Sequence, residues 1–186
     1  MQALVICGSR NRDGQTAQAA AALAQGLADQ GVGAEVVFLP ELQVERCRQC
    51  DADGWGLCRT QGRCTIADDF ESLRQRLRRA DRAVFATPVY FADLSESMRA
   101  FLDRLRRVCR SEEDRTGMAD KPVVGIAVAG GGGGGAPQAV LRLEQILSRC
   151  GFDVVDMVPV RRQNLTLKTG VLRLTGAWLA HCAPPE

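Results

Sequence analysis

Five short apolar segments, separated by stretches with helical periodicity, constrain the fold of this chain more than any other feature. The segments lie at residues 4–6, 34–39, 82–86, 122–129 and 152–158. Between them, apolar residues recur every three or four positions, which is typical of helices with one buried face. Buried strands that alternate with helices predict a parallel sheet covered on both faces. We therefore predict a single α/β domain over residues 1–186, with a doubly wound, five-stranded parallel sheet.

The helices are expected at about 16–30, 68–79, 95–108 and 137–150, and a last helix near the C-terminus. In the helix at 95–108, Met98, Phe101 and Leu105 share one apolar face. In the last helix one side carries four apolar residues: Val171, Leu174, Trp178 and Leu179.

Charge and hydropathy exclude several classes of protein. The formal net charge of the 186 residues is +2, so the chain has no strong field for nucleic acid. No apolar run reaches the roughly 20 residues that span a bilayer, and no secretion signal is visible. We expect a cytoplasmic protein that binds neither nucleic acid nor membrane.

The first predicted strand runs into a polar, glycine-containing loop and then directly into a helix. Ser9, Gln15 and Thr16 offer side-chain donors there, and the helix start adds unpaired backbone N–H groups. The loop has neither Gly-x-Gly-x-x-Gly nor a Gly-Lys-Ser/Thr ending, and such a loop suits a single phosphate monoester. An ordinary strand-to-helix turn with a helix cap is the alternative.

Two further loops are unusual. Residues 87–91 read Thr-Pro-Val-Tyr-Phe after the third strand, and six consecutive glycines, 130–135, follow the fourth. Taken alone, the first is a turn with two aromatic residues and the second a surface loop. In the strand order 2-1-3-4-5, however, both would meet the first loop at the carboxyl edge of the sheet, where such sheets bind ligands.

Four of the eight cysteines lie in an irregular segment at about 41–67, with the spacing Cys47-x2-Cys50-x7-Cys58-x5-Cys64. In a reducing compartment, grouped cysteines indicate metal ligands or redox groups rather than structural disulfides. The segment is compatible with an iron–sulfur cluster, a tetrahedral zinc, a reversible Cys47–Cys50 disulfide, or four thiols in a lid.

In the motifs of these loops the chain resembles the flavodoxin-like NAD(P)H-dependent FMN reductases, including the relatives called iron–sulfur flavoproteins. Four pieces carry the resemblance: Gly8-Ser9 with Gly14-Gln15-Thr16; Cys47, Cys50 and Gly62-Arg63-Cys64 with Asp68-Asp69; Thr87-Pro88-Val89-Tyr90-Phe91; and Phe101-Leu102-Asp103-Arg104. The gap between Cys50 and Cys58, which holds Asp53-Gly54-Trp55-Gly56-Leu57, departs from the compact cysteine motif of the iron–sulfur flavoproteins.

The resemblance implies a flavodoxin-like fold and an FMN site. It assigns the FMN phosphate to Ser9, Asn11, Gln15 and Thr16. It places Pro88, Val89, Tyr90 and Phe91 beside the isoalloxazine ring, and the run Gly130, Gly131, Gly132 near the ring or ribityl chain. It makes Cys47, Cys50, Cys58 and Cys64 the candidate metal ligands.

The expected function is transfer of hydride or electrons from NAD(P)H through FMN to a small acceptor such as a flavin or quinone. The flavin carries the chemistry, so no residue is assigned as a catalytic acid or base. The alternatives are an electron carrier with a cysteine-ligated iron–sulfur cluster that serves a protein partner, and a non-catalytic module with an empty pocket. The family implies a homo-oligomer, a dimer or tetramer, with contacts through the helix at 95–108 or the Trp178 helix.

Overall fold

The computed structural model describes residues 1–110 and 115–183. The elements are β1 (Gln2–Cys7), α1 (Gln15–Ala28), β2 (Gly33–Phe38), α2 (Leu57–Thr60), α3 (Phe70–Arg79), β3 (Arg82–Tyr90), β4 (Asp93–Leu94), α4 (Glu96–Val108), β5 (Pro122–Ala129), α5 (Ala136–Arg149), β6 (Asp153–Arg161) and α6 (Leu165–Leu179).

The parallel strands form one sheet in the order β2-β1-β3-β5-β6, which confirms the predicted doubly wound, flavodoxin-like fold. The register pairs Cys7 with Ala86 and Ala86 with Ile126, so the carboxyl ends of β1, β3 and β5 lie at similar heights. The chain order reverses between β1 and β3, which is the point where ligands bind in such sheets. The structure adds one short strand, β4, which pairs antiparallel with the end of β3.

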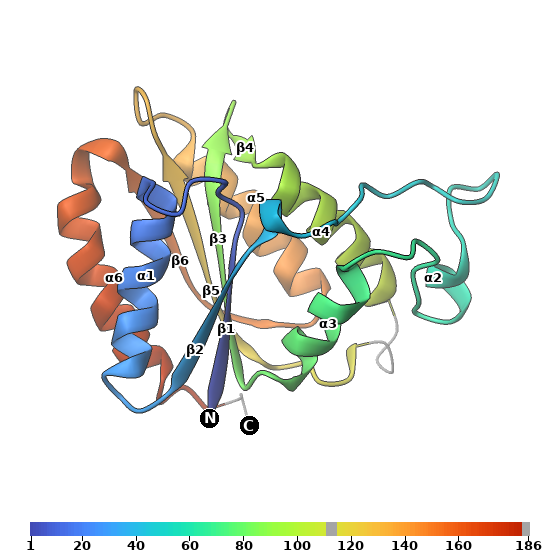
Figure 1. Cartoon of the computed structure of the whole chain (residues 1–186), viewed down its shortest axis with the longest axis horizontal. Coiled ribbons are helices and arrows are strands. Elements are labelled where there is room, and N and C mark those ends of the chain that lie inside the picture. Colours follow the sequence, from blue (N-terminus) through green and yellow to red (C-terminus); the bar gives the residue numbers. More distant parts are fainter. Residues whose placement is uncertain (111–114, 184–186) are drawn as a thin grey trace.

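Helices cover both faces of the sheet, as Figure 1 shows. Alternation along β1 divides its side chains between two cores. Leu4 and Ile6 face the core built with α3, α4 and α5, whereas Ala3 and Val5 face the core built with α1 and α6. Burial on both faces explains why the strands read as continuous apolar runs rather than alternating ones.

Two glycines allow α1 and α6 to pack in backbone contact. A Cβ added at Gly26 would lie 2.0 Å from the Arg173 carbonyl oxygen, and one added at Gly176 would lie 2.1 Å from that of Leu23. These contacts fix α1, whose N-terminus opens onto the carboxyl edge of the sheet.

Some local expectations need correction. The third strand does not end at 86 but continues to Tyr90. Thr87 and Pro88 still pair with β5, and Val89 and Tyr90 then form one arm of a hairpin with β4. In α6 the buried residues are Leu172, Gly176 and Leu179. Three of the four residues on the predicted apolar side, Val171, Leu174 and Trp178, are exposed, and the position of this side had not been predicted. The three α4 residues proposed for an oligomer contact, Met98, Phe101 and Leu105, are completely buried inside the protomer.

The crossing of α1 and α6 gives a testable expectation. Gly176→Ala should lower the free energy of unfolding by about 3 kcal/mol, because backbone at 2.1 Å leaves no room for a methyl group. Urea denaturation measures this change. The matched control is Gly170→Ala on the same helix, where an added Cβ meets nothing within 4 Å. Equal stability of the two variants would show that the close approach is absent in solution.

Candidate functional site

The loop between β1 and α1 is held by its own side chains. The Ser9 hydroxyl accepts from the Asn11 backbone N–H at 3.2 Å and donates to the Asn11 carbonyl at 3.1 Å. The Asn11 side-chain oxygen accepts from the Asp13 N–H at 2.9 Å. The N-cap of α1 is Gly14, which has no capping side chain. The first N–H groups of α1 are therefore open to an anionic ligand.

Hydrogen bonds tie this loop to the end of β3 and the start of α4. The Gly8 N–H donates to the Ala86 carbonyl at 2.8 Å, and the Ser97 hydroxyl donates to the Gly8 carbonyl at 3.1 Å. The buried Thr87 hydroxyl accepts from the Ser95 N–H at 3.0 Å, and Ser95 caps α4. The position of the first loop is thereby fixed relative to the β3–β4 hairpin.

The glycine run connects β5 to α5 and approaches the hairpin. Gly135 has a φ of +84°, and a Cβ added there would lie 2.7 Å from the Cα of Ala92, so only glycine fits. The Gln163 side chain donates to the Gly132 carbonyl at 3.2 Å. At Gly134, in contrast, an added Cβ would meet nothing within 4 Å. The run is therefore packed at Gly133, against Gln163, and at Gly135, and it is open at Gly131, Gly132 and Gly134.

The three loops line one cleft of about 520 Å³ at the carboxyl edge of the sheet. Most of the predicted cofactor residues meet there: Asn11, Gln15, Thr16, Pro88, Val89, Tyr90, Gly130 and Gly131. Four other residues line the cleft: Gly14 and Gly134, which belong to loops that the sequence singled out, and Val128 and Ala129, which were not expected there. Val128 and Ala129 could have been found from the rule that ligands contact the ends of the strands.

Three predicted cofactor residues lie outside the lining. Ser9 is buried behind the loop and shapes it through its hydrogen bonds to Asn11. Gly132 is exposed and does not contribute to the lining. Phe91 is fully exposed at the hairpin tip, where it and Ala92 have φ values of 49° and 61°. A tight turn of this kind displays Phe91 at the rim of the cleft rather than inside it.

The cleft is built for binding rather than for acid–base chemistry. Among its described lining residues, Tyr90 is the single titratable side chain, and the others are amide, hydroxyl, glycine and apolar groups. Its volume suits a ligand of cofactor size. The arrangement can hold a phosphate at the α1 end and a flat ring against residues 88–90.

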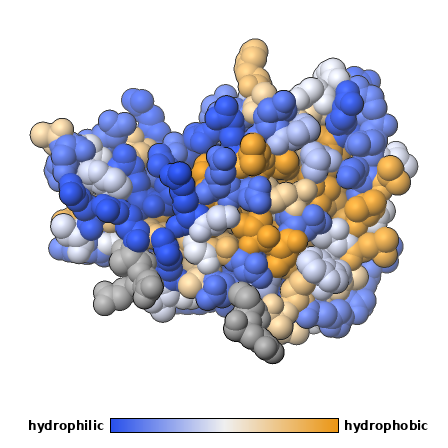
Figure 2. Space-filling view, turned by 180° about the vertical axis from the view of Figure 1, so that it is seen from behind, coloured by the Kyte–Doolittle hydropathy of each residue, from blue (hydrophilic) through white to orange (hydrophobic). Residues whose placement is uncertain are grey.

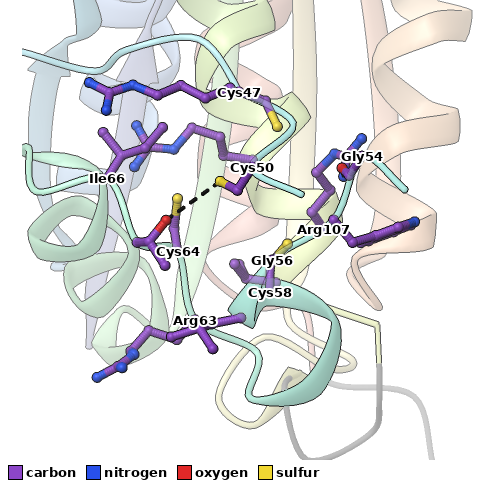
Figure 3. A pocket seen from close by; sticks show the side chains of 15 residues that line it. Cys47, Cys50, Gly54, Gly56, Cys58, Arg63, Cys64, Ile66 and Arg107 are labelled. Carbon is purple, nitrogen blue, oxygen red and sulfur yellow. Dashed lines mark hydrogen bonds between the residues drawn. The ribbon is translucent and has the colours of Figure 1, made fainter. Parts of the chain in front are cut away.

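The four cysteines of the irregular segment line a second, smaller pocket. Cys58 lies on the single turn of α2, and Cys47, Cys50 and Cys64 lie on the chain before and after it. Figure 3 shows the four side chains around one space. The Cys50 sulfur is 3.5 Å from the Thr65 hydroxyl. The described residues contain no group of three or more His, Cys, Asp or Glu side chains already positioned to share one metal ion.

The residues between Cys50 and Cys58 form a turn that is anchored to the end of α4. The Arg107 guanidinium lies 4.5 Å and that of Arg110 lies 4.7 Å from the centre of the Trp55 ring. Arg107 also donates to the Gly54 carbonyl at 2.8 Å. A Cβ added at Gly56 would lie 3.1 Å from the Cβ of Cys50. The extra residues therefore fold outward as a turn and leave Cys58 at the same pocket as the other cysteines.

A buried ion pair supports this pocket from below. The Arg104 side chain is 1% exposed and its partner Asp68 is 4% exposed. Burial acts to raise the pKa of Asp68, but the hydrogen bonds from Arg104 and from the Glu45 and Phe70 N–H groups outweigh it, and the pKa is lowered. For Arg104 burial acts to lower the pKa, whereas Asp68 and the nearby Cys64 raise it, and the net pKa is raised. The pair stays ionised at neutral pH.

No helix in the described parts of the chain is both long and apolar enough to cross a bilayer.

Comparison with known proteins agrees with the geometry. Residues 1–170 match the family described as NADPH-dependent FMN reductase. An iron–sulfur flavoprotein of Methanocaldococcus jannaschii is 28% identical over 131 residues, which are 70% of this chain and 62% of that protein. One from Archaeoglobus fulgidus is 28% identical over 77% of this chain and 66% of that protein. The match thus covers less than two thirds of the first relative's length.

Two solved structures share the fold. The NAD(P)H:quinone oxidoreductase of Methanothermobacter marburgensis superposes with a TM-score of 0.72 and 19% identity, covering 100% of this chain and 99% of that one. RosB with bound 8-demethyl-8-formylriboflavin-5'-phosphate gives a TM-score of 0.75 and 18% identity, covering 97% of this chain and 79% of that one. At these identities the likeness shows the fold alone.

Proposed function

Because the chain belongs to the NADPH-dependent FMN reductase family, we propose that it binds FMN in the cleft and transfers electrons from NAD(P)H to a small acceptor. The observation that carries the proposal is the convergence of three separate loops on one cleft at the carboxyl edge of the sheet. A flavin or a quinone is the acceptor class we favour.

The chemical character of the residues in the cleft suits the phosphate and the ring of FMN. The open N–H groups of α1, with the side chains of Gln15 and Thr16, would hold the phosphate. Pro88, Val89 and Tyr90 would flank the isoalloxazine ring, and the backbone of Gly130 and Gly131 would approach it closely because no side chain intervenes.

When bound, FMN would supply the redox chemistry, taking hydride from NAD(P)H and releasing electrons. The tasks left to the chain are to orient the ring, to keep water from its buried face and to leave the other face open for a second substrate. Pro88 and Val89 would serve the first two tasks, while Gly131 and Gly134, which have no side chain, would leave the cleft open.

A substitution in the glycine run tests the FMN site. Gly134→Leu should weaken FMN binding by at least about tenfold, because Gly134 lines the cleft and a Cβ added there meets nothing within 4 Å, so that a larger side chain would take up space in the cleft. Titration of apoprotein by flavin fluorescence measures the dissociation constant. The control is Gly132→Leu, in the same run and equally open, but outside the lining. The same affinity for both variants would place the flavin elsewhere.

A second candidate function is electron transfer through a thiolate-bound iron–sulfur cluster to a protein partner. Four thiols around one space are the donor set of such a cluster or of a structural zinc. Four arginines, Arg48, Arg63, Arg104 and Arg107, also line the pocket, and none of the lining residues is a carboxylate. Arg48 and Arg104 are paired with Glu45 and Asp68 behind the lining, which leaves Arg63 and Arg107 as its excess positive charge. A positively charged pocket favours a negatively charged metal–thiolate centre over four neutral thiols.

Metal content tests this second function. After anaerobic reconstitution with ferrous iron and sulfide, we expect bound iron and acid-labile sulfide in the wild-type protein and their loss in Cys64→Ser. The control Cys182→Ser alters a half-buried cysteine outside the pocket and should keep both. Zinc in place of iron would make the pocket a structural site, and absence of any metal would leave FMN as the single redox group.

We also infer that a second copy of the chain packs on α6. Four exposed apolar side chains follow each other at helical spacing on this helix: Leu167, Val171, Leu174 and Trp178. Beside them β6 is an edge strand with half-buried apolar residues, and Figure 2 shows apolar side chains gathered on this back face. A twofold contact uses the same patch on both copies, and an apolar stripe on one helix can pack in this way against its own copy.

Sedimentation velocity tests the α6 contact. Leu174→Glu should shift the protein toward the monomer, because a buried carboxylate would oppose association. Leu141→Glu is the matched control, as Leu141 is 54% exposed on α5, away from the stripe. An unchanged sedimentation coefficient for Leu174→Glu would exclude this surface.

A further inference from the structure

Arg104 on α4 is the most deeply buried arginine in the described parts of the chain, with 1% of its side chain exposed. It lies at the base of the cysteine pocket and contributes to its lining. A charged side chain is rarely buried to this extent unless its hydrogen-bonding groups are all used.

Two of the three guanidinium nitrogens are used by protein groups. Nη1 donates to Asp68 Oδ2 at 2.5 Å and to the Glu45 carbonyl at 3.1 Å, and Nη2 donates to Asp68 Oδ1 at 2.9 Å. The guanidinium also lies 4.2 Å from the centre of the Phe70 ring. These contacts hold the group in one orientation.

The third nitrogen has no partner. Nε of Arg104 is buried, and among the described residues it is the one buried side-chain nitrogen or oxygen without a hydrogen bond. A buried N–H without an acceptor is unfavourable, so such a group in a folded protein calls for an explanation. The neighbouring pocket residue is Cys64, whose side chain lies beside the guanidinium.

The charge of the pocket points in the same direction. Asp68 balances the charge of Arg104, and Glu45, 2.6 Å from Arg48, balances that of Arg48. Arg63 and Arg107 line the same pocket without a carboxylate among the lining residues. A divalent metal bound by four thiolates carries a net charge of about −2 by simple summation of ligand and metal charges, and a four-cysteine iron–sulfur cluster is also anionic. Such a centre would supply both the counter-charge and a sulfur acceptor for Nε.

We propose that Arg104 is a positioning residue for a thiolate-bound metal centre, donating its free Nε–H to the Cys64 sulfur and balancing the negative charge of the centre. This inference rests on the second proposed function, in which the four cysteines bind metal. Hydrogen bonds from outside the ligand set commonly orient a ligand and contribute strongly to metal affinity.

Cobalt(II) is the probe for this role, because its thiolate complexes are coloured and it replaces zinc or ferrous iron at tetrahedral sulfur sites. The variants are Arg104→Lys and the double variant Arg104→Gln with Asp68→Asn. Arg104→Lys keeps the positive charge, but a lysine cannot donate hydrogen bonds to both Asp68 and the Cys64 sulfur. The second removes both members of the ion pair, so that no unpaired charge is left buried. Each variant is first compared with wild type by circular dichroism and thermal unfolding.

The measured quantity is the dissociation constant for Co²⁺ from the thiolate-to-metal absorption. We expect both variants to bind at least about tenfold more weakly than wild type. The matched control is Arg74→Gln, which removes another buried arginine, 7% exposed and paired with Glu71 on α3, outside the pocket. This control should bind within about twofold of wild type, well under the 1.4 kcal/mol of a tenfold change.

The outcomes separate the two proposals. Folded Arg104 variants with wild-type Co²⁺ affinity would overturn the role of Arg104, and so would an equal loss in Arg74→Gln. If the wild-type protein binds no Co²⁺ and assembles no cluster, the four-cysteine site itself is wrong.

Discussion

The parallel pairing of β1 with β3 is the constraint on which both sites depend. The pairing of Cys7 with Ala86 places the ends of the two strands side by side. The hydrogen bond from the Gly8 N–H to the Ala86 carbonyl extends this pairing into the loop after β1. Because the chain order reverses here, helices on opposite faces leave an opening between them. The cleft follows from this topology, and the loop residues determine which polar and apolar groups line it.

Helix α4 connects the cleft with the cysteine pocket. Its first turn is fixed at the cleft by the hydrogen bonds of Ser95 and Ser97, and its later turns present Arg104 and Arg107 to the cysteines. Nine residues separate Ser95 from Arg104, which corresponds to about 14 Å along a helix axis. The cleft and the cysteine pocket are therefore both attached to one helix.

The fold and the cleft could be predicted from the sequence because they follow from local patterns. Buried strands such as 122–129 are apolar throughout, and the three unusual loops could be placed by the strand order alone. The exposed position of Phe91 at the hairpin tip could not be predicted from the sequence. The hairpin of β3 with β4 depends on backbone angles that the amino-acid composition does not indicate. The sequence also did not show which side of α6 is buried, because Gly26 and Gly176 let α1 pack closely on the face that carries Leu172, Gly176 and Leu179. Apolar periodicity cannot reveal such a contact.

The pairing of Arg104 with Asp68 could not be predicted from the sequence either, because a contact between residues 36 positions apart is set by the tertiary structure.

The most direct test of the central proposal is the anaerobic titration of the purified protein with FMN, followed by addition of NADPH. We predict one tightly bound FMN per chain, released on denaturation, and loss of its visible absorption when NADPH is added. A protein that takes up no FMN would contradict the assignment of the cleft. Bound FMN that neither NADPH nor NADH reduces would contradict the proposed reaction while leaving the binding site in place.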